Sequence, residues 1–201
     1  MACILTLGRK EPCKDSVGGI KNVYFVDFGG LGTVSYDTTD TDVIDDLTGT
    51  TIGGTANSLT AYKYEVKGNS SLEQTVTASR ENGTVFYEQT LNLTLHKLTK
   101  EDNKELRLMA YGRPHICVED YNGNCMMMGL ENGADVSGGT IVTGAAMGDM
   151  SGYTLTFSGT EKKPASFMEV TQLPSVVDYP FTVTDFAGLS GTITITEGAN
   201  S

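Results

Sequence analysis

The sequence predicts a mainly β fold: an antiparallel β-sandwich or barrel with one flanking α-helix and extended loops. Three observations predict this fold class. Several segments alternate apolar and polar residues, as strands with one buried face do. Glycine occurs 24 times in 201 residues and threonine is frequent, which is typical of strands joined by many turns. Only one segment has apolar residues at helical spacing.

The chain divides into three predicted parts. Residues 1–19 form an N-terminal arm, residues 20–172 form the β domain, and residues 173–201 form a C-terminal hairpin extension. The two predicted strands of the extension are 181–184 and 192–196. A hairpin of this size is marginally stable by itself, so we expect it to dock on the β domain or on a neighbouring subunit.

The first predicted strand of the β domain covers residues 20–28. Its odd-numbered face carries Val23 and Phe25, and its even-numbered face carries Tyr24 and Val26. A strand that is apolar on both faces is covered on both faces. We therefore expect this strand in the centre of a sheet.

Three further strands are predicted before the helix. Residues 61–67 and 72–78 alternate apolar and polar side chains, and we expect them to pair through a turn at 68–70. Residues 84–98 form a long strand after a second turn. The residues of this strand that we expect to face inward are Leu91, Leu93 and Leu95.

Residues 100–111 form the predicted helix. Thr99 is a suitable N-cap, and Glu101 and Asp102 in the first turn complement the helix dipole. Gly112 is the expected C-cap, because a proline follows two residues later and prevents continuation.

Residues 115–130 are predicted to form a β-hairpin with a two-residue turn at Asn122-Gly123. In this register Cys117 and Cys125 point to opposite faces of the sheet and cannot form a disulfide. We therefore expect free thiols and a reducing compartment.

A segment rich in small residues, 133–151, follows the hairpin and is predicted to be a flexible connector. A strand at 153–157 and an edge strand at 165–170 come after it. The residues that we assign to an assembly contact of the connector are Gly138, Gly139, Gly144, Met147 and Gly148.

The stretch 29–58 is rich in glycine, threonine and aspartate, with one short predicted strand at 34–36. Because structureless loops of this length are uncommon in compact domains, the stretch is either an extended hairpin arm or a segment that orders against a partner. Its acidic cluster consists of Asp37, Asp40, Asp42, Asp45 and Asp46. The spacing of Asp40 and Asp42 is that of a calcium-binding EF-hand loop, but the glycine and glutamate that such a loop needs are missing. We therefore expect no metal and interpret the cluster as a charged contact loop.

The chain has a net charge of −11 and a sequence pI near 4.5. This balance argues against stable binding to nucleic acid or to an anionic membrane, since both need Lys and Arg. Only two histidines occur, and no nucleophile motif or phosphate-binding loop accompanies them. We predict a protein that is not an enzyme and that uses no cofactor, metal or small-molecule substrate. No run approaches the ~20 apolar residues of a membrane helix, and synthesis in the cytoplasm is expected.

Three segments of the chain resemble a family of virion proteins. They are residues 13–21 (CKDSVGGIK), residues 118–124 (VEDYNGN) and residues 148–159 (GDMSGYTLTFSG), the last followed by Pro164-Ala165. Together they resemble the tail tube or tail-ring subunits of tailed phages of the Bacteroidetes group, including the crAss-like phages. The similarity covers roughly residues 10–170.

The resemblance implies a non-enzymatic structural protein with the β-sandwich or barrel fold of a phage tail tube. Such subunits form rings, commonly hexamers, in which the sheets of neighbouring subunits join into an inner β-barrel. The rings stack into a tube through which DNA passes during ejection. The implied partners are other copies of the chain and adjacent tail-ring proteins, and DNA passes without specific binding. The implied location is the virion tail, after synthesis in the host cytoplasm.

On this reading the acidic cluster faces the lumen or contacts the next ring. The N-terminal arm, the stretch 29–58 and the C-terminal hairpin are further inter-ring contacts. Two alternatives remain at this point: a monomeric β-sandwich that binds carbohydrate or acts as an adhesin, and a capsid decoration or connector protein. Sugar-binding modules usually present aromatic platforms, and tryptophan often forms them. This chain contains no tryptophan.

Overall fold

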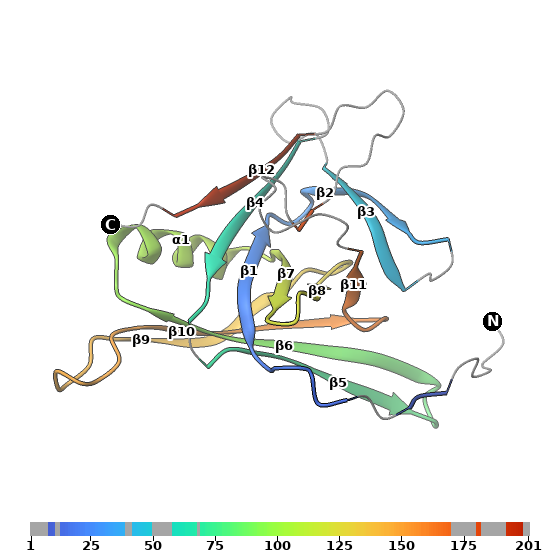
Figure 1. The fold of residues 1–201 in the computed structure, drawn as a ribbon, viewed down its shortest axis with the longest axis horizontal. Coiled ribbons are helices and arrows are strands. Elements are labelled where there is room, and N and C mark those ends of the chain that lie inside the picture. Colours follow the sequence, from blue (N-terminus) through green and yellow to red (C-terminus); the bar gives the residue numbers. More distant parts are fainter. Residues whose placement is uncertain are drawn as a thin grey trace.

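The computed structural model describes residues 8–10, 13–38, 42–49, 58–67, 69–169, 180–181 and 192–198. These residues form two β-sheets and one α-helix (Figure 1). Asp40 and most of the predicted strand 181–184 lie outside the described residues.

Eight strands form the larger sheet. Their bounds are β1 Ile20–Val26, β2 Leu31–Tyr36, β3 Val43–Gly49, β4 Ser58–Glu65, β7 His115–Asp120, β8 Cys125–Met128, β11 Ser166–Met168 and β12 Thr192–Glu197. They lie in the order β12-β4-β1-β7-β8-β11-β3-β2. The predicted central position of the first strand is confirmed, because β1 pairs with β4 on one side and with β7 on the other.

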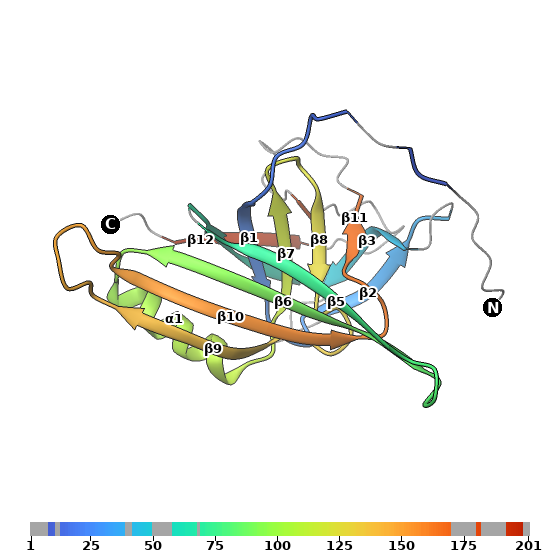
Figure 2. The same ribbon diagram turned by 90° about the horizontal axis from the view of Figure 1, so that it is seen from below.

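Four strands form the smaller sheet. They are β5 Ser71–Ser79, β6 Thr84–His96, β9 Asp135–Val142 and β10 Gly152–Glu161, in the order β5-β6-β10-β9. All neighbours in this sheet are antiparallel. The smaller sheet lies across one face of the larger sheet (Figures 1 and 2).

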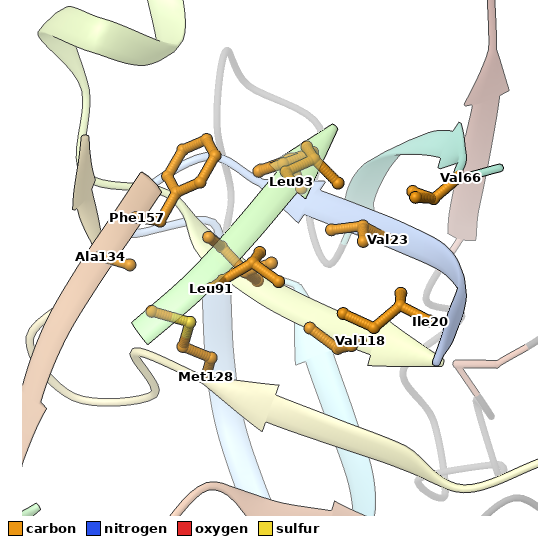
Figure 3. Close-up of a cluster of buried hydrophobic side chains, with 11 residues drawn as sticks. Ile20, Val23, Val66, Leu91, Leu93, Val118, Met128, Ala134 and Phe157 are labelled. Atoms are coloured by element: carbon orange, nitrogen blue, oxygen red, sulfur yellow. The ribbon is translucent and has the colours of Figure 1, made fainter. Parts of the chain in front are cut away.

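The main core lies between the two sheets. Figure 3 shows side chains from both sheets meeting there. The larger sheet contributes Ile20, Val23, Val118 and Met128, and the smaller sheet contributes Leu91, Leu93 and Phe157. The inward orientation of alternate leucines in β6 is therefore confirmed, with Leu95 partly buried at the edge of the same cluster.

A second buried cluster lies on the opposite face of the larger sheet. Tyr24 of β1, Ile44 of β3, Leu59 of β4 and Met127 of β8 belong to it. Phe181 closes it with an edge-on contact to the Tyr24 ring at 5.8 Å between centroids. Because strands from both halves of the strand order contribute, the larger sheet curls around this cluster. The two-sided apolar pattern of β1 is explained by these two cores.

The helix α1 (Lys100–Tyr111) agrees with its prediction. The Thr99 hydroxyl accepts a hydrogen bond from the Asp102 N–H at 3.0 Å, as an N-cap should. Gly112 is the C-cap, and its N–H donates to the Leu108 and Met109 carbonyls. Leu106 is the buried side chain of the helix.

The predicted pairing of residues 61–67 with 72–78 is wrong. β4 pairs with β1 and β12 in the larger sheet, whereas β5 pairs with β6 in the smaller one. The chain crosses from one sheet to the other between them. Val66 is buried in the main core, and the Ser70 hydroxyl accepts a hydrogen bond from the Thr94 N–H at 3.0 Å. Alternation fixes which face of each strand is buried but not which sheet receives the strand.

The predicted register of the β7–β8 hairpin is wrong by one residue. Glu119 pairs with Cys125, so three residues rather than two form the loop. The loop still needs Gly123, whose φ is +84°, in the region that favours glycine. The Asp120 carboxylate stabilises this longer loop by accepting hydrogen bonds from the Asn122 and Asn124 N–H groups, each at 2.8 Å.

The register also changes the account of the cysteines. Cys117 and Cys125 lie on the same sheet face, as diagonal neighbours, and both are completely buried. The described cysteines, Cys13, Cys117 and Cys125, are in no disulfide, as predicted, although the predicted reason was wrong.

The segment 133–151 is not a flexible connector throughout, because β9 lies within it. β11 is not an edge strand either, since it lies between β8 and β3. Its pairing with β3 and the pairing of β12 with β4 are parallel, so the fold is not wholly antiparallel. The stretch 29–58 contains the antiparallel strands β2 and β3. They form a hairpin, which is one of the two forms that the sequence allowed.

Candidate functional site

The outer face of the smaller sheet is the most unusual surface of the described residues. Side chains directly opposite each other in a ladder lie on one face, and the leucines of β6 define the inner face. The residues on the outer face are largely hydroxylated, and we name them the hydroxyl face. They are Ser71, Thr75, Thr77, Ser79, Thr84, Thr90, Thr94, Thr140, Thr154, Thr156, Ser158 and Thr160.

The hydroxyl face carries no positive charge from its strands. β5, β6, β9 and β10 contain neither Lys nor Arg. Glu73, Glu88 and Asp135 share the face and are exposed. The same ladders also place Phe86, Asn92 and His96 on it. The strands of this surface therefore offer mainly hydrogen-bonding hydroxyls and a few carboxylates, but neither Lys nor Arg.

Hydrogen bonds between side chains tie the hydroxyl face together across its strands. The Thr140 and Thr154 hydroxyl oxygens are 2.6 Å apart, and the Thr156 hydroxyl donates to Asn92 Oδ1 at 3.0 Å. On β9, the Ser137 hydroxyl donates to the Thr156 carbonyl at 3.2 Å. These contacts link the polar side chains across β6, β10 and β9.

The smaller sheet has an edge strand on each side, β5 and β9. Within the described residues, no strand pairs with the outer edge of either one. On β9, Ile141 is 61% exposed although it lies opposite the buried Tyr153 on the inner face. Open edges with apolar side chains invite pairing with another chain.

The inner apolar face of the β5–β6 hairpin continues past the core. Val76 and Val85 lie on this face but are 58% and 55% exposed. Figure 2 shows the closed end of the hairpin projecting beyond the larger sheet. A two-stranded ribbon with one uncovered apolar face is marginally stable in water, so this end is suited to contact with another surface.

The described members of the acidic cluster lie elsewhere, in the β2–β3 hairpin at the edge of the larger sheet. Asp42 Oδ1 is 3.5 Å from Lys163 Nζ, and the Lys163 ammonium lies 5.0 Å from the centre of the Tyr36 ring. Asp37 follows β2, and Asp45 and Asp46 lie within β3. Among the described residues no group of three or more His, Cys, Asp or Glu side chains is arranged to hold a metal ion.

The assembly residues predicted in the connector divide between a strand and a loop. Gly138 and Gly139 lie in β9, where Gly139 approaches the backbone of β10. The others lie in the loop between β9 and β10: Gly144, which has a φ of +76°, the fully exposed Met147, and Gly148. In this loop the Asp149 carboxylate accepts hydrogen bonds from the Ala145 and Ala146 N–H groups.

A buried carboxylate, Glu119, stands on β7 near the start of β1. Its side chain is 1% exposed and accepts hydrogen bonds from Lys21 Nζ at 2.7 Å, Asn22 Nδ2 at 2.6 Å and the Tyr24 hydroxyl at 3.1 Å. A bulge between Ile20 and Asn22 brings Lys21 and Asn22 to the same carboxylate. Burial raises the pKa of Glu119, but these hydrogen bonds and the Lys21 charge outweigh it and lower the pKa overall. The cluster is fully paired, which favours a structural role.

The buried histidine, His115, is also held by the fold. Its Nδ1 is 2.6 Å from the Gly129 carbonyl, and its Nε2 accepts a hydrogen bond from the Gly29 N–H at 3.3 Å. Burial lowers the pKa of His115, against the opposing effect of the Gly129 hydrogen bond. The ring is therefore a neutral structural link between β7, β8 and the loop after β1.

The sequence prediction missed the hydroxyl face. The signal was present, because threonine, asparagine or serine occupies every second position of 90–94 and 154–158. Within one segment, such residues indicate only the exposed side of a strand. Their meaning depends on four strands lying next to one another, and the smaller sheet brings together segments far apart in the sequence.

The structure contains no helix, within the described residues, that is long and apolar enough to cross a membrane. In comparisons with protein-family models, curated proteins and solved structures, none matches this chain.

Proposed function

We propose that the chain is a non-enzymatic structural subunit that assembles with other copies into rings of a phage tail tube, with the hydroxyl face lining the lumen. One observation carries the proposal: the four strands of this face contain neither Lys nor Arg. A protein binds DNA mainly by placing cations on its phosphates. A wall of hydroxyl groups and carboxylates lets DNA pass without being held.

The two open edges of the smaller sheet support the ring. In this assembly β5 of one copy lies beside β9 of the next, so that the sheets form one continuous barrel. The contact is head-to-tail, and such a contact closes into a ring when the rotation between copies divides a full turn. Closure removes every open edge of the sheet.

The first test is negative-stain electron microscopy of the purified protein, with light scattering on the same sample. Rings or short tubes with a central hole are the expected result. A uniform 21.4 kDa monomer at every concentration would contradict the proposal and favour the monomeric binding module instead. Particles without a central channel would favour a decoration protein.

The lumen assignment has its own test. Replacing Thr77 and Thr90 by lysine places two cations on the hydroxyl face, and rings of this variant should retain DNA at low salt. The matched control places the same two charges at Asn103 and Ala110, which are exposed on α1. Equal DNA retention by the two variants would contradict the assignment of the hydroxyl face to the lumen.

A further inference from the structure

The helix α1 presents an exposed stripe of basic and apolar side chains. Lys100, Lys104, Arg107, Leu108 and Tyr111 lie on the side of the helix away from the buried Leu106, and we name them the α1 stripe. Leu108 is 51% exposed and Tyr111 is 83% exposed. The stripe therefore combines three cations with two uncovered apolar side chains.

Asp102 and Glu105 are half-buried on a different flank of the helix, whereas the exposed Glu101, three residues before Lys104, lies beside the stripe. Burial raises the pKa of Tyr64 on β4, and the nearby carboxylates of Asp102 and Glu105 raise it further, to about 12. These two carboxylates therefore lie on the side of the helix that faces the sheet. Lys104 Nζ is 3.9 Å from Glu105 Oε1, and its side chain is 68% exposed. An exposed ion pair at this distance adds little, so the cations of the stripe are available to a partner.

The charge of this region is opposite to that of the whole chain. Residues 97–113 contain five of the 14 basic residues and three acidic residues. Residues 22–62 contain six aspartates and neither Lys nor Arg. Of these aspartates, Asp37 follows β2 and Asp42 precedes β3 in the β2–β3 hairpin. The two regions are electrostatically complementary.

The two regions cannot meet within one chain. α1 and the β2–β3 hairpin lie toward opposite ends of the long axis of the molecule, in both views (Figures 1 and 2). The strands of the smaller sheet run along the same axis. A contact between the two regions therefore joins copies end to end, whereas contacts between the sheet edges join copies side by side.

We propose that the α1 stripe binds the acidic β2–β3 hairpin of a second copy of this chain. Where the proposed rings form, this contact stacks one ring on the next, and to that extent it rests on the proposed function. The cations of the stripe meet the aspartates, and Leu108 and Tyr111 are covered by the same hairpin. The partner is a second copy because the required acidic surface is present at the other end of the molecule.

The two kinds of contact respond differently to salt. Attraction between exposed charges is screened when the Debye length falls from about 10 Å at 0.1 M salt to about 3 Å at 1 M. Pairing of sheet edges depends on backbone hydrogen bonds and buried apolar area, which such salt does not weaken. High salt should therefore separate stacks into single rings without opening the rings.

A charge exchange tests the contact directly. The helix variant is Lys104→Glu/Arg107→Glu, and the hairpin variant is Asp37→Lys/Asp42→Lys. Each variant alone brings like charges together at the contact, and end-to-end association measured by sedimentation at low salt should weaken by about tenfold or more. An equimolar mixture of the two restores opposite charges at every contact, so association should return.

The matched control is Lys67→Glu/Lys162→Glu, which changes the net charge by the same amount as the helix variant at exposed sites outside the stripe, the N-terminal arm and the end of the β5–β6 hairpin. It should stack as the unmodified protein does, and circular dichroism should give all variants the same fold.

Electron microscopy separates the two proposals. If rings form and their stacking is unchanged by salt and by charge exchange, the contact between the α1 stripe and the β2–β3 hairpin is wrong and the proposed function stands. Charge-dependent end-to-end association without rings would support the contact and overturn the proposed function. A monomer at every salt concentration would overturn both.

Discussion

The side-chain amide of Asn122 forms two hydrogen bonds with the backbone of Val17. Asn122 Nδ2 donates to the Val17 carbonyl at 2.8 Å, and Asn122 Oδ1 accepts from the Val17 N–H at 2.9 Å. The Asn122 amide thus pairs with the N–H and the carbonyl of Val17, as the backbone of a neighbouring strand would. Asn122 is itself held by Asp120, which accepts hydrogen bonds from its N–H and from its Nδ2. The β7–β8 loop is therefore the anchor of the N-terminal arm.

Asn122→Ala should release the arm without unfolding the protein. Both bonds to Val17 are exposed, so we expect a loss of about 1 kcal/mol or less in the free energy of unfolding. Hydrogen–deuterium exchange should show faster exchange at Val17. The control is Asn82→Ala in the β5–β6 turn, and equal exchange at Val17 in the two variants would show that Asn122 does not anchor the arm.

Two adjacent glycines of β9 should respond differently to alanine. A Cβ at Gly139 would lie 2.5 Å from the Thr154 carbonyl oxygen, whereas a Cβ at Gly138 meets nothing within 4 Å. Gly139→Ala must push β9 away from β10, and we expect a loss of about 1–3 kcal/mol. Gly138→Ala should change stability by less than about 0.5 kcal/mol. Thermal unfolding of the two variants checks this, and equal melting temperatures would contradict the described β9–β10 pairing.

Glu119 should make the protein sensitive to acid. Its pKa is lowered in the fold, so its contribution to stability is present above the unfolded pKa of about 4.3 and is lost as the pH falls through the lower folded value. Glu119→Gln leaves the donors of Lys21 and Asn22 facing an amide, and we expect a loss of about 2 kcal/mol at neutral pH. Denaturant unfolding from about pH 7 to pH 3 should also show a shallower pH dependence in this variant. If the free energy of unfolding depended on pH equally in the variant and the unmodified protein, Glu119 would not be the source of the acid sensitivity.

Glu161 should affect the pH dependence of stability in the direction opposite to Glu119. Burial raises its pKa, against hydrogen bonds from the Asn132 and Glu131 N–H groups. A raised carboxyl pKa gives stability that is present below the unfolded value and is lost as the pH rises through the folded value. Glu161→Gln keeps an oxygen for both N–H groups and removes the buried charge. We expect it to be neutral or stabilising by up to about 1 kcal/mol at neutral pH, and a large loss of stability would contradict this account.

A charge on the open edge of β9 should prevent side-by-side assembly. Ile141→Lys places an ammonium group at an exposed edge position, a change that edge strands use to avoid pairing. We expect the variant to sediment as a monomer with a melting temperature close to that of the unmodified protein. Val17→Lys, at an exposed site on the arm, is the control. Rings formed equally by both variants would show that this part of β9 is not in the ring contact.

The helix and the central strand were predictable because their signals are local. Thr99, Glu101 and Gly112 define the helix ends within one segment. The apolar residues at both odd and even positions of β1 require cover on two sides, wherever that cover comes from.

The pairings were less predictable because they depend on partners outside each segment. The Asn122-Gly123 dipeptide is compatible with two- and three-residue loops, and the Asp120 carboxylate favours the longer one. β9 was missed because two glycines weaken its alternation, and its position depends on the close approach of Gly139 to β10. The hydroxyl face was missed for the same reason, since it exists only once four strands are aligned.

The pairing of β12 with β4 has a consequence for biosynthesis. Thr192 lies beside Ser58, so the partner of β4 is made long after β4 itself. At about 5–20 residues per second, the delay on the ribosome is on the order of 10 s. During this time the outer backbone ladder of β4 lacks the partner that it has in the finished fold. Nascent chains can therefore associate prematurely along β4, and termination of synthesis before residue 192 would make that hazard permanent.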